Sequence, residues 1–315
     1  MLGATFLVAL AAVGLMGFAT QRGGTCTVAA VEEIFLERRF WRMAALIEAS
    51  LWVGGGMLLL SVAGLLTRMP VGYEAGAMTI AGGVLLGVGA FMNRTCAFGS
   101  IGRLGSGDLA FIGTLVGFFG GSVAVIHIAS PREFAGQSSL LQASAWFGLL
   151  CILLVFVRLC THGWTIWRQR IAWHQHIWSP HVATTIIGLA FLVAYLSVGS
   201  WTYTDTIVDL SRGSMIEIMP RLLLFAALIA GAVLGAWTAG VSKLIVPSPA
   251  RVIRHLAGGA LMGAGAAMVP GGNDGLILMG MPLLWPYAWL AFASMCITIY
   301  IALRLTPRPQ VAGRA

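Results

Sequence analysis

The stretch 81–92, AGGVLLGVGAFM, recurs 176 positions later as 257–268, AGGALMGAGAAM. Eight of the twelve aligned residues are identical, and the alignment needs no gap. The same shift brings three further positions onto identical residues: Gly55, Ala63 and Gly64 fall on Gly231, Ala239 and Gly240. We therefore predict two halves of common fold. The first repeat covers 1–130, a linker covers 131–176, and the second repeat with a basic tail covers 177–315.

The composition predicts that both halves lie in a membrane. The chain has 315 residues, of which 58% are hydrophobic and 10% are charged, and its mean hydropathy is +0.89. A soluble domain has about 25% charged residues, so this chain lacks the polar surface that water requires. The same figures exclude intrinsic disorder, which needs low hydrophobicity and high charge. The net charge of +8 indicates Lys and Arg held at the cytoplasmic face, and no binding of nucleic acid.

Nine apolar stretches are long enough to cross the roughly 30 Å hydrocarbon core of a bilayer. They are 3–20, 42–67, 74–92, 108–128, 141–158, 181–198, 220–241, 252–270 and 284–304. Four shorter apolar pieces fit half-helices, which exist at membrane depth only where protein shelters their ends. These pieces are 26–36, 96–103, 202–210 and 273–281. We predict one integral membrane domain, an all-α polytopic protein with about nine transmembrane helices and four short inward-pointing half-helices.

The number of spans predicts how the two halves are related. The linker adds the central span 141–158 to the four spans of the first half, so an odd number precedes the second half. The second half then enters the membrane from the opposite side, which is the inverted-repeat plan of many transporters. Basic residues gather on one side of such a fold, at 37–42, 158–170, 243–254 and 304–314. Because positively charged loops stay in the cytoplasm, we place this side and the C-terminus there.

The short segments carry the candidate binding residues. Each opens with Thr, Ser, Asn or Asp, whose side chains accept hydrogen bonds from the free N–H groups at a helix start. A buried helix start attracts anions, since it combines unpaired donors with partial positive charge. In the first half Cys26 follows Thr25 and Cys96 follows Thr95, and thiols suit a soft, sulfur-bearing anion. The alternative is that both cysteines are small, buried packing residues.

Charged residues beside these segments are further candidates. Arg22 and Arg94 precede the two cysteine segments, where they would attract an anion, reach the membrane interface or pair with an acid. Asp274 has the opposite effect, because an ionised carboxylate beside an anion path repels the anion unless it is paired or protonated. Asn273 and Asp274 therefore leave a cation or a protonated group open as a ligand.

Three stretches resemble the YeeE/YedE family of sulfur-compound transporters, in order and over most of the chain. They are 17–30 (GFATQRGGTCTVAA), 82–109 (GGVLLGVGAFMNRTCAFGSIGRLGSGDL) and 256–276 (LAGGALMGAGAAMVPGGNDGL). The resemblance implies short helices pointing to the centre of the fold and uptake of thiosulfate or a related sulfur anion, held by cysteine thiols. It also implies the bacterial cytoplasmic (inner) membrane as location, and a small cytoplasmic sulfurtransferase of the TusA type as partner.

Cys26 and Cys96 match the cysteine positions of that family, whereas Gly272 stands where the family usually has Cys. The predicted substrate path comprises Arg22, Thr25, Cys26, Arg94, Thr95, Cys96, Gly272 and Asn273. The sequence contains no phosphate-binding loop, no metal-ligand spacing and no CxxC pair, so we expect a transporter that is not an enzyme and holds no cofactor or metal. Two alternatives stay open. One is a non-transporting membrane subunit or sensor, and the other is a membrane thiol oxidoreductase that uses Cys26 and Cys96.

Overall fold

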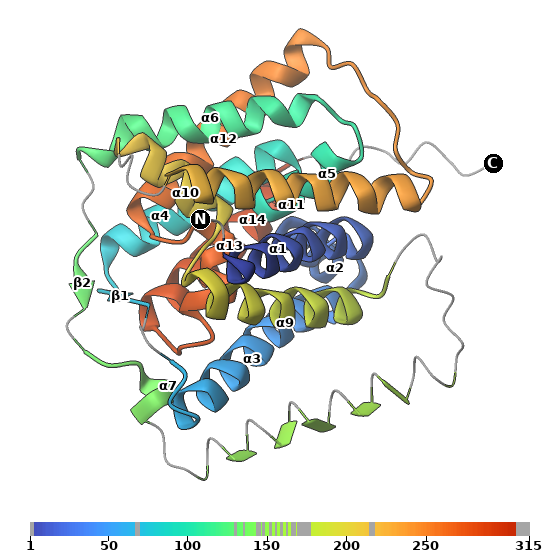
Figure 1. Cartoon of the computed structure of the whole chain (residues 1–315). Helices are drawn as coiled ribbons and strands as arrows, with labels where there is room; N and C mark the ends of the chain where they lie inside the picture. The colour runs from blue at the N-terminus through green and yellow to red at the C-terminus, as the bar shows by residue number, and fades with distance from the viewer. Residues whose placement is uncertain are drawn as a thin grey trace.

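The fold is a bundle of helices with one short pair of strands (Figure 1). The computed structural model describes residues 3–66, 70–128, 131–134, 136–142, 178–213 and 218–306, with scattered positions between 146 and 168. The first-half helices are α1 (Ala4–Gly23), α2 (Thr27–Glu37), α3 (Trp41–Val62), α4 (Ala77–Asn93), α5 (Ala97–Gly105) and α6 (Ala110–Ile126), followed by the single turn α7 (Ser139–Gln142). The second-half helices are α9 (Pro180–Val198), α10 (Tyr203–Ser211), α11 (Ile218–Thr238), α12 (Pro249–Met268), α13 (Gly272–Gly275), the π-helix η1 (Leu276–Gly280) and α14 (Pro286–Leu305). Strand β1 (Gly72–Tyr73) pairs antiparallel with β2 (Glu133–Phe134).

The long helices fit a membrane protein. Within the described residues, six stretches are long and apolar enough to cross a bilayer, and α12 with α13 and η1 forms a seventh if this pair, bent by 47°, counts as one span. Two of the six stretches combine two helices each, Ala4–Glu37 and Ala77–Gly105. The prediction of an all-α polytopic membrane protein is confirmed. Eight of the nine predicted spans coincide with a described helix, but α6 has only 17 residues. Because half of the residues in the predicted span 141–158 lie outside the described residues, the total of nine stays a prediction.

Four breaks in the long helices produce the short helices. Each break contains a residue with a positive φ: Gly24 (φ 54°), Arg94 (φ 54°), Gly199 (φ 82°) and Gly271 (φ 96°), the last followed by Gly272 (φ 48°). A left-handed residue ends a helix, and glycine adopts it without steric cost. Within four residues of these breaks, α2, α5, α10 and α13 begin. The short helices therefore coincide with the four predicted half-helices, and their starts lie inside the bundle.

Small residues let the long helices pack with their backbones almost in contact. A Cβ on Gly231 of α11 would lie 1.8 Å from the Gly14 carbonyl oxygen of α1, and a Cβ on Gly263 of α12 would lie 1.9 Å from the Phe118 carbonyl oxygen of α6. In lipid the hydrophobic effect does not drive helices together, so close van der Waals packing of this kind holds them in contact instead. The high glycine content of the chain thus serves helix–helix contacts as well as the breaks.

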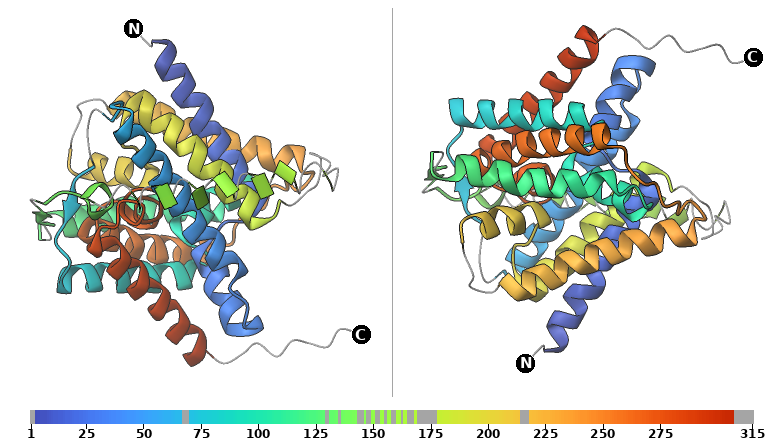
Figure 2. Two further views of the ribbon diagram at one scale, coloured as in Figure 1. Left: turned by 90° about the horizontal axis from the view of Figure 1, so that it is seen from below. Right: turned by 90° about the horizontal axis from the view of Figure 1, so that it is seen from above.

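The same helix–helix contacts recur when each helix is replaced by its counterpart in the other half of the chain. Helix α1 packs on α11 as α9 packs on α3, and α12 packs on α6 as α4 packs on α14. The element starts also follow the shift in the sequence, since α1 begins at Ala4 and α9 at Pro180. Figure 2 shows the start of α1 and the end of α14 projecting from opposite sides of the bundle. This arrangement agrees with two repeats, and their inverted orientation in the membrane remains a prediction.

Candidate functional site

Two cysteines begin the two short helices of the first half. Cys26 is the N-cap residue of α2 and Cys96 is the N-cap residue of α5, both with extended backbone. Each sulfur accepts a hydrogen bond from the start of the other helix. The Cys96 N–H donates to Cys26 Sγ (3.3 Å), and the Thr27 N–H donates to Cys96 Sγ (3.4 Å). The sulfurs thus satisfy N–H groups that Ser or Thr oxygens satisfy at an ordinary helix start, and the two starts are held together.

The neighbouring threonines complete this cysteine cluster. Thr95 Oγ1 lies 3.3 Å from Cys26 Sγ, whereas Thr25 Oγ1 is buried without a hydrogen-bond partner among the described residues. Gly99 donates its N–H to Cys96 Sγ at 3.4 Å, and a Cβ on it would lie 2.3 Å from Thr95 Oγ1. Glycine is therefore required for this close approach. The structure brings the four predicted residues Thr25, Cys26, Thr95 and Cys96 together.

A cavity of about 670 Å³ opens beside the cysteine cluster. Cys26 and Thr25 contribute to its wall, whereas the Cys96 side chain is fully buried. The charged residues of the wall are Glu32, Glu33, Glu37, Arg42, Arg94 and Arg103. Arg42 lies 3.5 Å from the Glu33 carboxylate, but the exposed Arg94 and Arg103 form no ion pair within the described part of the chain. These two guanidinium groups are available to an anion in the cavity.

Arg22 lies elsewhere. Its side chain is 3% exposed, donates a hydrogen bond to Thr238 Oγ1 (2.8 Å) and stacks over the Phe18 ring at 5.2 Å from the ring centre. These contacts join α1 to the end of α11, and Arg22 is not among the residues that line the cavity. The structure therefore separates Arg22 from the other predicted site residues of the first half.

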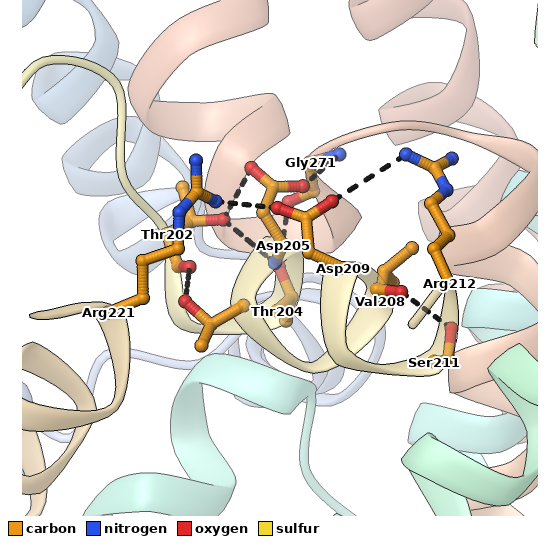
Figure 3. Close-up of polar contacts among 10 residues, drawn as sticks. Thr202, Thr204, Asp205, Val208, Asp209, Ser211, Arg212, Arg221 and Gly271 are labelled. Carbon is orange, nitrogen blue, oxygen red and sulfur yellow. Dashed lines mark hydrogen bonds and ion pairs between the residues drawn. The ribbon is translucent and has the colours of Figure 1, made fainter. Parts of the chain in front are cut away.

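The second half has a cluster of oxygen atoms where the first half has sulfur (Figure 3). Thr202, the N-cap residue of α10, accepts a hydrogen bond from the Asp205 N–H (3.2 Å) and donates to Asp205 Oδ2 (2.8 Å). Asp205 Oδ1 accepts from the Gly271 N–H (2.9 Å). Thr204 Oγ1 lies 3.0 Å from the Gly271 carbonyl oxygen and also contacts Asp274 Oδ1. These contacts join α10 to α13, as the cysteines join α2 to α5.

The predicted residues Gly272 and Asn273 belong to this second cluster. Gly272 has a left-handed backbone (φ 48°), and a Cβ on it would lie 2.7 Å from Thr204 Oγ1. Thr204 thus fills the space beside the position that the repeat aligns with Cys96. The Asn273 side chain is 1% exposed, and neither its amide nitrogen nor its amide oxygen has a partner among the described residues.

Two narrow spaces lie between the clusters. Thr25 and Asp274 line one of them, and Thr202 and Asp274 line the other, while Phe98 and Leu278 border both. Their volumes are about 10 Å³ and about 0 Å³, at or below what one water molecule needs. Neither of these two spaces is large enough for an anion, so the described part of the chain is closed at both.

Sequence reasoning missed Thr204, Asp205 and Phe98 as parts of the site. The repeat offered a signal for the first two, because the shift of 176 places Thr202 on Cys26 and so marks α10 as the counterpart of α2. Further along α10, the Asp209 carboxylate pairs with Arg221 and with Arg212 (Figure 3).

Comparison with known proteins agrees with this architecture. The chain matches the family described as Sulphur transport over residues 22–301. It is 27% identical to the thiosulfate transporter TsuA of Escherichia coli strain K12, over 95% of this chain and 94% of that protein. It is 28% identical to the thiosulfate transporter TsuA of Spirochaeta thermophila, over 88% of this chain and 92% of that protein. With a family match that covers most of its length and most of its helices, the chain belongs to the Sulphur transport family.

Proposed function

We propose that this protein takes up thiosulfate, or a closely related sulfur anion, across the bacterial inner membrane. The observation that carries the proposal is the cysteine cluster, in which two half-helix starts and two thiols meet beside a charged cavity. The two similar proteins named as thiosulfate transporters support the choice of anion. The path runs from the Thr202–Asp274 cluster, past Cys26 and Cys96, into the cavity.

The cysteine cluster suits the terminal sulfur of thiosulfate. Helix starts offer N–H donors and partial positive charge, which stabilise an anion without a permanent counter-ion. Thiols are weak donors and polarizable, so they bind a soft sulfur atom weakly enough to release it. Arg94 and Arg103 then draw the anion from the thiols into the cavity. Selection for transport requires such moderate binding, since a tightly held anion would not leave.

The position of the basic loops supports a cavity that opens toward the cytoplasm. The Lys243 N–H donates to the carbonyl oxygen of Ser106, a residue of the cavity wall, and Arg251 pairs with the nearby Asp108. Loops rich in Lys and Arg remain on the cytoplasmic side. A cytoplasmic sulfurtransferase of the TusA type would meet the anion at this mouth, where Glu37 and Arg42 lie. The C-terminus would lie on the same side.

Transport requires the narrow level between the clusters to open. Phe98 of α5 and Leu278 of η1 border both narrow spaces there. Helices of inverted repeats rock against each other in many transporters, which opens a central site to one side at a time. We propose that such rocking separates Phe98 from Leu278, and that the described conformation is the one open to the cytoplasm.

Thiosulfate uptake into proteoliposomes tests the proposal. The wild-type protein is compared with empty liposomes, with Cys96→Ala, and with Cys296→Ala as the matched control. Cys296 lies on α14 and does not line the cavity. We expect Cys96→Ala to lose at least about 90% of uptake, because removal of a contact worth roughly 1.4 kcal/mol lowers a rate tenfold. Cys296→Ala should transport as the wild type does.

Two results would contradict this. Unchanged uptake by a folded Cys96→Ala protein would remove the thiol from the path. No uptake by the wild type would leave the membrane architecture intact and direct the search to other anions. Sulfate, which lacks the soft terminal sulfur, serves as the competitor that measures selectivity, and we expect it to compete weakly.

A further inference from the structure

Asp274 is a carboxyl group buried without a cation. Its side chain is 3% exposed and contacts Thr204 Oγ1. No Lys, Arg or His within the described residues lies at ion-pair distance from it. An ionised carboxylate in such surroundings is costly, so a group of this kind is neutral or holds a cation.

Counting hydrogen atoms in the cluster distinguishes the two states. Thr204 Oγ1 carries one hydrogen but lies at hydrogen-bond distance from two acceptors, Asp274 Oδ1 and the Gly271 carbonyl oxygen. The hydrogen of Thr202 is already committed to Asp205 Oδ2 (2.8 Å). If Asp274 is ionised, one of the two contacts of Thr204 joins two oxygens with no hydrogen between them. If Asp274 is protonated, its O–H donates to Thr204 Oγ1, and the Thr204 O–H donates to Gly271. One proton on Asp274 therefore satisfies both of these contacts of Thr204, whereas the 3.3 Å contact between Thr202 Oγ1 and Thr204 Oγ1 has no hydrogen when Thr202 donates to Asp205 and Thr204 donates to Gly271.

A second, independent observation points to the space beside Asp274. Thr25 Oγ1 is buried (4% exposed), has no hydrogen-bond partner among the described residues and lines the same narrow space as Asp274. Thr25 also lines the large cavity. Its hydroxyl thus stands between the cavity and the carboxyl, where it would bind the anion or a water molecule that delivers a proton. Asp274 thus borders the proposed anion path, because Thr25 connects its narrow space with the large cavity.

Other titratable groups face Asp274 from the neighbouring elements. Asp205 and Tyr203 lie on α10, and Tyr203 lines one narrow space together with Asp274. None of these groups carries a positive charge. A proton is therefore the charge that neutralises Asp274 in this conformation.

We propose that Asp274 is a proton-binding site, and that its proton crosses the membrane together with the sulfur anion. The proposal rests on the proposed function for the identity of the anion. The proton binds Asp274 Oδ1 from the water on one side and leaves to the water on the other side, so no other reactant is needed. One proton with one doubly charged anion moves a net charge of −1. The neutral carboxyl lets the anion pass, and the ionised carboxylate repels it when no proton is bound.

Uptake driven by a proton gradient tests this. Proteoliposomes with acidic outside medium are compared with proteoliposomes at equal pH, and an internal pH dye records proton entry when thiosulfate is added. If one proton is coupled, each unit of pH gradient raises the accumulation of thiosulfate by up to about tenfold. The quantity compared is the ratio of thiosulfate accumulation with the pH gradient to accumulation at equal pH. In Asp274→Asn, whose amide still donates to Thr204, we expect this ratio to fall to about one and the dye signal to disappear. The control is Asp209→Asn, which removes a carboxylate paired with Arg221 in the same half and should retain the ratio.

Several outcomes would overturn the proposal. They are wild-type uptake without proton entry, uptake that follows an inward Na⁺ gradient at equal pH, and a pH-gradient ratio that survives in Asp274→Asn. Infrared spectroscopy of the purified protein tests the proton site independently of transport, so failure of the proposed function can be told apart from failure of this proposal. The C=O stretch of a protonated carboxyl should be present in the wild type and absent in Asp274→Asn, whichever substrate is transported. If that band is absent from the wild type, the proton site is refuted even where thiosulfate uptake is intact.

Discussion

Gly272 is the position at which the structure makes its sharpest quantitative prediction. The residue falls on Cys96 when the sequence is shifted by 176 positions, so if a cysteine was lost here by drift, a side chain should be easy to restore. The structure predicts the contrary. A Cβ on Gly272 would lie 2.7 Å from Thr204 Oγ1, 2.9 Å from Thr204 Cβ and 3.1 Å from Thr204 Cγ2, and the backbone of Gly272 is left-handed (φ 48°). We therefore expect Gly272→Ala, and Gly272→Cys still more, to destabilise the protein.

The magnitude follows from two separate costs. A side chain in the left-handed region costs roughly 1–2 kcal/mol. Overpacking of a filled interior by one or more carbon atoms typically costs about 1–3 kcal/mol. Because Thr204 is held by its contacts to Gly271 and Asp274, it cannot move away freely. The free energy of unfolding should therefore fall by about 3 kcal/mol in Gly272→Ala.

A matched control lies three residues further along α13. A Cβ on Gly275 would meet its nearest neighbour, Thr202 Cγ2, at 3.5 Å, which is ordinary contact, and the backbone of Gly275 is helical. Gly275→Ala should be neutral or stabilising, because alanine loses less backbone entropy than glycine on folding, by about 0.5–1 kcal/mol. The assay is unfolding of the purified protein in detergent, followed by fluorescence against denaturant, for both variants and the wild type.

Removal of the Thr204 side chain distinguishes a steric clash with Thr204 from a destabilisation of residue 272 that does not depend on Thr204. Thr204→Ala removes two of the three close atoms, Oγ1 and Cγ2. We expect the double variant Gly272→Ala, Thr204→Ala to recover about 1–2 kcal/mol relative to the sum of the single changes, since neighbours couple by this amount. Equal stabilities of Gly272→Ala and Gly275→Ala would refute the reasoning, as would strictly additive effects at 272 and 204.

Two further predictions follow from the site and from the helix packing. The first prediction concerns a variant in which Cys26 and Cys96 are the only cysteines. A negatively charged thiol reagent should label Cys26, which lines the cavity, much faster than the buried Cys96, and thiosulfate should slow the labelling of Cys26. Equal rates, measured by mass spectrometry, would mean that the cavity does not lead to Cys26. Gly231→Ala should destabilise the protein by at least about 2 kcal/mol, because its Cβ would lie 1.8 Å from the Gly14 carbonyl oxygen. Gly120→Ala, with no atom within 4 Å of its Cβ, is the control and should leave the unfolding midpoint unchanged or raised, as detergent unfolding of both variants would show.

Much of the architecture followed from the sequence, because a bilayer restricts the choices. Backbone groups in hydrocarbon must all be hydrogen-bonded, and a single apolar stretch of about 20 residues achieves this within itself only as a helix, which is why the long stretches predicted helices. The short segments were also predictable, because they are too short to cross and open with residues that cap helices. The repeat at a shift of 176 relates α2 to α10, whose starts at Thr27 and Tyr203 differ by this number, and it relates most of α4 to α12.

The sequence by itself determined that the protein is helical, membrane-embedded and repeated, and that Cys26 and Cys96 stand at helix starts. These properties depend on local pattern, which is written along the chain. Only the tertiary structure decided which side chains meet. Arg22 and Arg94 both shortly precede a cysteine segment, yet Arg22 binds Thr238 while Arg94 lines the cavity, because Arg22 belongs to the last turn of α1 whereas Arg94 is the left-handed cap residue of α4. Likewise the pairing of Thr204 with Asp274 joins residues 70 positions apart, so its geometry exists only once α10 and α13 have packed together.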